Sequence, residues 1–245
     1  MSKDAAPAQS LAVVMGLPLA DGVFATLVLA GTLDTAVGVV QTGLLVFGGA
    51  ATAALLLASD RSRPADGRRL LRIGVPLVTV AAAEAALAGT FVSVVDTATF
   101  RPFAGLVLVA VAARVASAHV TRYLPGPGIV VAVGAVLSFD PNGPVAIAPD
   151  ATAALHAVAA AGIGVAFGLG VVAARPHLRR ILDAERFRFG SAVALGTMGA
   201  SVAGLVPSGS PLPLVALALA AVLAFDPNRE DVDAGTDSGE DAPTR

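Results

Sequence analysis

The chain has 245 residues, of which 56% are hydrophobic and only 14% charged, and its formal net charge is −2. A soluble domain carries about a quarter of charged residues, so this composition excludes a soluble globular protein and predicts an integral membrane protein. The chain has no cysteine, which excludes disulfides, thiolate metal sites and cysteine nucleophiles, and its only lysine, Lys3, precedes every apolar segment, which excludes a Schiff base inside a helix.

Eight apolar segments follow one another along the chain, each close to the length that a helix needs to cross the hydrocarbon of a bilayer. They cover residues 11–33, 37–58, 71–95, 103–118, 125–139, 151–174, 189–206 and 212–225. The predicted fold class is therefore all-α, a polytopic transmembrane bundle of about eight short helices. The segments 125–139 and 212–225 would span only about 21–23 Å as helices, so their full crossing is left open.

Small residues dominate these segments and allow close approach of helix backbones in lipid. Gly164 and Gly168 form one small-xxx-small step, which we expect to pack helices within the chain. Residues 1–10 are expected to form an N-terminal tail before a retained first helix. Residues 229–245 are rich in Asp and Glu and poor in apolar residues, and they are expected to be disordered.

The arginines predict the orientation of the segments, because loops that stay in the cytoplasm carry the excess of Lys and Arg. Twelve arginines lie after the second, fourth and sixth segments, whereas the loops between these hold one, Arg101. Eight crossings with both termini in the cytoplasm account for this distribution. The predicted location is the plasma membrane, with the lipid bilayer as the main partner.

Internal similarity indicates a duplication. Residues 103–142 align without a gap on 189–228 with thirteen of forty positions identical, and both copies end in Phe-Asp-Pro-Asn. A weaker similarity relates 16–33 to 74–91. The chain is then interpreted as a hairpin, 11–58, followed by two three-helix copies, 71–142 and 151–228. Because three crossings is an odd number, the copies are expected to be inverted in the membrane, as in many secondary transporters.

Two carboxylates are the candidate ion- or substrate-binding residues, because acidic side chains near the middle of a membrane helix are costly and often mark ion pathways. Glu84 lies near the middle of the third segment and Asp21 near the middle of the first. They are close enough in depth to share a cavity. The alternative is a protonated carboxyl that is hydrogen-bonded for packing.

No catalytic residue, metal site or cofactor is predicted, and the protein is not expected to be an enzyme. The three histidines lack the spacing of metal ligands. No nucleic-acid partner is expected, and the oligomeric state is left open. The two Asp-Pro-Asn sequences are interpreted first as helix terminations, since proline stops a helix and asparagine turns the chain.

Arginine in place of lysine, the acidic tail and the Ala-, Val- and Gly-rich segments resemble membrane proteins of halophilic archaea. The whole chain is similar to multi-pass families from those organisms, with the Phe-Asp-Pro-Asn ends as the specific marks. This resemblance implies a plasma membrane in high salt, and it implies no activity and no site residues.

The leading hypothesis for the function is a small secondary-transporter-like or permeation protein that uses its midplane carboxylates on a small solute or a cation. The main alternative is a structural or accessory membrane protein without transport. A water-accessible cavity that reaches Glu84 would favour transport, whereas a dry bundle would favour the accessory role.

Overall fold

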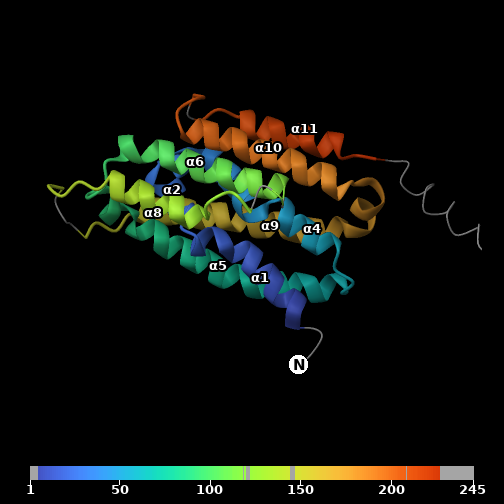
Figure 1. The fold of residues 1–245 in the computed structure, drawn as a ribbon. Coiled ribbons are helices and arrows are strands. Elements are labelled where there is room, and N and C mark those ends of the chain that lie inside the picture. Colours follow the sequence, from blue (N-terminus) through green and yellow to red (C-terminus); the bar gives the residue numbers. More distant parts are fainter. Residues whose placement is uncertain (1–4, 118, 120–121, 144–146, 208, 227–245) are drawn as a thin grey trace, which may run out of the picture.

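The computed structural model describes residues 5–117, 119, 122–143, 147–207 and 209–226, and in these ranges the protein is all-α (Figure 1). No strand occurs among them, and two isolated β-bridges are the only extended pairings described. The elements are α1 (Ala5–Ala20), α2 (Val23–Leu29), η1 (Thr32–Asp34), α3 (Ala36–Gln41), η2 (Thr42–Gly48), α4 (Ala50–Leu57), α5 (Arg63–Val92), α6 (Thr97–Ala116), α8 (Pro127–Leu137), α9 (Ala151–Ile181), α10 (Ala184–Val202) and α11 (Leu212–Leu223). The predicted all-α class is confirmed.

Each of the eight predicted segments contains helix, but several boundaries differ from the prediction. Helix α1 begins at Ala5, inside the stretch expected to be a tail, and α5 begins at Arg63, before the predicted start at residue 71. The acidic tail, 229–245, lies outside the described residues. Helices α8 and α11, with 11 and 12 residues, are shorter than predicted and reach about 16–18 Å.

Three helices in the described part of the chain, α5, α6 and α9, are long and apolar enough to cross a membrane. The count rises to five if each of two bent helix pairs is one span. Many large apolar side chains are exposed along the outer helix faces, including Val75, Leu106, Val136 and Leu219. An apolar surface of this kind is typical of contact with lipid or with another protein.

The first two segments are each bent, and the first is broken at a glycine whose backbone other residues avoid. Gly22 has a φ of 71°, and the helices on either side of it are bent by 41°. The second segment bends by 48° near Gly49, directly after the π-helix η2. By contrast, α5 runs for 30 residues without a break, so the weak similarity of 16–33 to 74–91 does not extend to helix geometry.

The core forms around α9, which packs against α5, η2 and α4, while α6 and α10 pack against each other. Gly164 and Gly168 allow these contacts, since a Cβ on them would lie 2.4 Å from Phe47 Cβ and 2.8 Å from Leu70 Cδ2. The glycine step therefore packs helices within the chain, as expected. Phe24 and Phe47, both fully buried, place their ring centroids 5.2 Å apart.

Two helix pairs, α6 with α8 and α10 with α11, are closed by matching backbone contacts. In the first, Asp96 N donates to Ser138 O at 2.7 Å and Asp140 N donates to Val94 O at 2.9 Å. In the second, Asp183 N donates to Ala224 O at 2.8 Å and Asp226 N donates to Ile181 O at 2.7 Å. The aspartates of the two Phe-Asp-Pro-Asn sequences thus end both pairs in the same way.

The two pairs are closed at different ends of the bundle (Figure 1). In that view α6 begins and α8 ends toward the left, whereas α10 begins and α11 ends toward the right. The α4–α5 and α9–α10 connections also lie at the right, and most of the arginines lie in the helix ends that adjoin them. We call this the arginine-rich end, and the other the opposite end.

Candidate functional site

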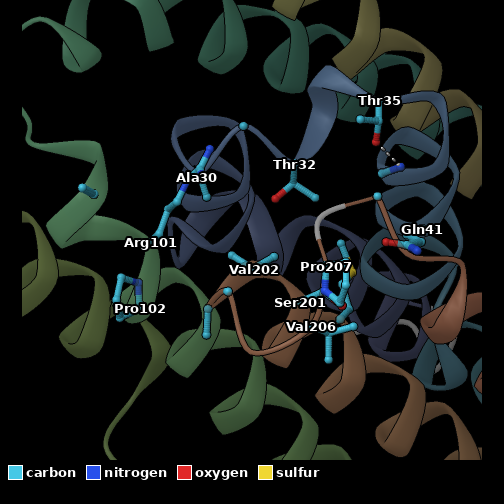
Figure 2. A pocket seen from close by; sticks show the side chains of 17 residues that line it. Ala30, Thr32, Thr35, Gln41, Arg101, Pro102, Ser201, Val202, Val206 and Pro207 are labelled. Atoms are coloured by element: carbon cyan, nitrogen blue, oxygen red, sulfur yellow. Dashed lines mark hydrogen bonds between the residues drawn. The ribbon is translucent and has the colours of Figure 1, made fainter.

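A cavity of about 500 Å³ lies at the opposite end of the bundle (Figure 2). We call it the vestibule. Three parts of the chain line it: the turn from α2 into α3, the first turns of α6, and the end of α10 with the loop that follows. The vestibule therefore lies between the broken N-terminal hairpin and the two helix pairs. Its polar side chains are Thr32, Thr35, Gln41, Arg101 and Ser201.

Three of these polar side chains hydrogen-bond within the protein. Gln41 Nε2 donates to Ser210 O at 2.8 Å and ties the hairpin to the α10–α11 loop. Thr35 Oγ1 accepts from Gly38 N and caps α3, and Ser201 Oγ donates to Thr197 O. The vestibule wall is therefore held in place by its own polar groups.

The other two polar side chains, Arg101 and Thr32, have no ion pair or side-chain hydrogen bond in the described part of the chain. Figure 2 shows Arg101 extending from α6 beside Ala30, across from Thr32. Gly31 admits this close approach. A Cβ there would lie 3.5 Å from Arg101 Nη2 and 2.8 Å from Asp34 Oδ2, and the φ of 73° also favours glycine.

Glu84 lies on a second concave surface, a groove of about 460 Å³ between α1 and α5. Its wall is apolar except for Glu84 and the exposed Arg72, which lie twelve residues apart, or about 18 Å along the helix. Glu84 is half-buried, and its Oε2 atom is buried without a hydrogen-bond partner among the described residues. The packing alternative requires a hydrogen bond from within the protein, and the described residues offer none to this atom.

Asp21 follows the last residue of α1 and directly precedes the break at Gly22. Its carbonyl oxygen lies 3.6 Å from where a Cβ of Gly128, in α8, would be. Ala20 lines the groove with Glu84, but Asp21 lines neither cavity. The two candidate carboxylates are therefore not brought into one described cavity.

A buried charge cluster at the arginine-rich end was not anticipated from the sequence. Arg175 of α9 forms a short ion pair with Asp66 of α5, and both side chains are almost fully buried. Arg175 Nη1 also donates to Ser59 O at 3.0 Å and Arg61 O at 2.8 Å. Arg179 Nε donates to Leu57 O at 2.6 Å, so the α4–α5 loop is held onto α9. We call these contacts the clamp.

Helical periodicity in the sequence could have identified the residues of the clamp. Residues 66, 70, 74, 77, 81, 85 and 88 form one buried face of α5, and Asp66 is its first member. Arg175 likewise continues the buried face of α9 that contains Gly164 and Gly168. The segments predicted from apolar content began at 71 and ended at 174, so both residues fell just outside them.

No group of three His, Asp or Glu side chains suited to a metal ion occurs in the described ranges. Residues 77–203, just over half of the chain, match the model of a family of unknown function (DUF5794). No curated protein and no solved structure matches the chain. The matched range spans the second half of α5 and all of α6, α8, α9 and α10, and it includes Glu84 and Arg101.

Proposed function

The chain belongs to this family of unknown function, whose description assigns no activity, and we propose from its structure that it is a small secondary-transporter-like or permeation protein of the membrane. The observation that carries the proposal is the pair of concave surfaces. The polar vestibule lies at one end of the bundle, and the groove that contains Glu84 lies along α5.

Membrane insertion with eight crossings is part of the proposal. The apolar outer faces, the three to five helices suited to a span, and the arginines gathered at one end support it. The arginine-rich end then faces the cytoplasm, together with both termini, and the vestibule faces the outside. Helices α8, α10 and α11 would complete the count of eight. The short α8 and α11 would do so where the bilayer is thin or where neighbouring helices cover their ends.

Inverted repeats are also part of the proposal. The matched backbone contacts at Asp140 and Asp226, which close the two helix pairs at different ends, support a duplication with opposite orientation. A second match supports it: a Cβ on Gly134 would meet Phe103 between α8 and α6, and a Cβ on Gly190 would meet Ala220 between α10 and α11. Inverted repeats let two halves of a transporter exchange roles.

The broken hairpin supplies the barrier between the two surfaces. Ala20 lines the groove and Ala30 lines the vestibule, so α2 lies between them along the chain. Helix α2 is anchored by Phe24, which packs against Phe47 of η2 in the buried core. The movement proposed to connect the surfaces is a shift of α2 about the break at Gly22, which Asp21 directly precedes, and about the turn at Gly31.

Glu84 is the residue proposed to bind a proton or a cation. A carboxylate in the middle of a membrane helix is stable as an ion only when water or a cation offsets its charge. The groove admits either one, and the buried Oε2 atom lacks an internal partner.

The test is a flux or proton-uptake assay in vesicles that compares wild type with Glu84→Gln at matched protein levels. The amide keeps the shape and removes the charge, so ion-dependent flux should be lost while insertion is retained. Glu185→Gln, at an exposed carboxylate of the arginine-rich end, is the matched control and should keep wild-type flux. Unchanged flux in Glu84→Gln removes this residue from the mechanism.

One observation favours the alternative, a structural or accessory membrane protein. The vestibule and the groove are separate cavities, and the core between α2 and η2 is filled by Phe24 and Phe47. A wild-type protein without flux for any solute in a broad panel would make this alternative the better account.

A further inference from the structure

The vestibule holds an arginine whose position is unusual for this chain. Arg101, in the first turns of α6, is the one basic residue between the predicted segments at the opposite end, whereas twelve arginines follow the second, fourth and sixth segments. In a membrane protein, a positive charge on the exported side opposes the bias that orients the helices. The bias that orients the helices therefore does not explain why an arginine occupies position 101. We look for the reason in the side chains around it.

Those surroundings leave the guanidinium group available to a ligand. Arg101 lines a cavity of about 500 Å³, a volume typical of sites for small molecules, and it lacks an ion pair in the described part of the chain. Thr32, whose hydroxyl is likewise unused, lines the same cavity. Together they offer a planar cationic donor and a neutral donor on facing walls (Figure 2).

Asp34 limits which anion can bind. Its carboxylate oxygen Oδ2 and the Arg101 Nη2 atom both lie close to Gly31, at 2.8 Å and 3.5 Å from the position of a Cβ there. A nearby carboxylate repels a doubly charged anion more strongly than a singly charged one. The planar guanidinium group matches the geometry of both carboxylate and phosphate, so the charge of the anion determines which of the two binds more tightly.

We propose that the vestibule is a binding site for the carboxylate group of a small singly charged solute, with Arg101 as its ionic partner and Thr32 as a second donor. The proposal specifies the substrate class of the transport function proposed above, and its role in transport rests on that function. Binding itself can be measured without transport.

The experiment uses the purified full chain in detergent and follows its thermal midpoint as ligand is added, since a ligand that binds the folded state raises it. Lactate and acetate are compared with lactamide and acetamide, which keep the shapes and lack the charge, and with inorganic phosphate. The carboxylates should stabilise the protein, and the amides should not. Phosphate should be weaker than lactate.

Three variants assign the effect to residues. Arg101→Gln should weaken lactate binding about tenfold or more, the usual effect of losing a charged hydrogen-bond partner. Arg122→Gln is the matched control, because it removes one exposed positive charge outside the vestibule and should leave binding unchanged. Asp34→Asn should raise the affinity for phosphate relative to lactate.

Three results overturn the proposal: equal effects of carboxylates and amides, lactate binding retained in Arg101→Gln, or phosphate bound more tightly than lactate by wild type. Flux in vesicles separates this proposal from the transport function. Carboxylate binding without flux leaves the site standing and refutes transport, whereas flux without charge-dependent binding refutes the site alone.

Discussion

The two ends of the bundle use the same side chain in opposite ways. At the arginine-rich end, Arg175 is buried and its charge is met by Asp66 and by two backbone carbonyls. At the opposite end, Arg101 is exposed in the vestibule without an ion pair in the described ranges. At one end the arginine thus holds neighbouring elements together, whereas at the other end the arginine lines a cavity without an ionic partner in the described ranges.

This difference predicts different effects of removing the two charges. A buried ion without its partner is costly, so the contacts of Arg175 are expected to stabilise the fold. Arg101 remains near solvent, so the fold loses little when its charge is removed. Stability measurements should respond to changes at one end, and binding measurements to changes at the other.

The largest effect is expected at the clamp. Asp66→Ala leaves Arg175 buried without its carboxylate and should lower the free energy of unfolding by about 3–5 kcal/mol. Arg101→Gln should change it by less than about 0.5 kcal/mol, because the side chain is exposed and unpaired. Both values follow from denaturation in detergent monitored by circular dichroism. Equal losses at the two ends would contradict the comparison.

A double variant sharpens the same point. Replacing both partners with apolar residues, as Asp66→Leu with Arg175→Met, removes the unpaired charge and should recover most of the stability lost in Asp66→Ala. Since Arg175 also donates to carbonyls of the α4–α5 loop, a remaining loss would report what these bonds contribute.

A smaller loss of stability is expected at the corresponding N-caps of the two helix pairs. The Asp183 carboxylate accepts from Glu185 N and Arg186 N at the start of α10, and the Asp96 carboxylate accepts from Ala98 N at the start of α6. Asp183→Ala should cost about 1 kcal/mol, as the loss of an N-cap usually does. Asp96→Ala should also destabilise the protein, and a thermal melt of each variant measures both losses.

The smallest effect is a pH dependence at Asp96. Hydrogen bonds from the Thr99 hydroxyl and from Ala98 N lower the pKa of this carboxyl from its ordinary value. Its stabilising contribution is therefore complete above the unfolded pKa of about 3.9 and is lost as the pH falls through the lower folded value. The thermal midpoint of Asp96→Asn should fall less than that of wild type between pH 5 and pH 3. Parallel curves would show that Asp96 does not contribute.

The helices were predictable because apolar content and length carry the signal, and each of the eight segments contains helix. The bend near Gly49 was missed, because a glycine inside an apolar run is compatible with either a straight or a bent helix. Helix ends were also missed at Arg63 and Ile181, where polar residues continue a helix beyond its apolar part.

The candidate site was predictable only in part. Glu84 could be singled out because a lone carboxylate in an apolar helix is conspicuous, and the structure places it in a groove. The vestibule was not foreseen, since it joins Thr32, Arg101 and Ser201 from three distant parts of the chain. Tertiary packing brings these residues together, and the residue pattern within a single helix does not predict tertiary packing.

The most direct test of the account uses the absence of cysteine from the chain, which lets single cysteines report exposure without background. Thr32→Cys places a thiol in the vestibule, and Ser62→Cys places one at the exposed start of α5, at the arginine-rich end. In intact cells, a membrane-impermeant maleimide should label Thr32→Cys at once and Ser62→Cys only after permeabilisation. Labelling of Ser62→Cys in intact cells, with Thr32→Cys protected, would contradict the proposed orientation and the outward-facing vestibule.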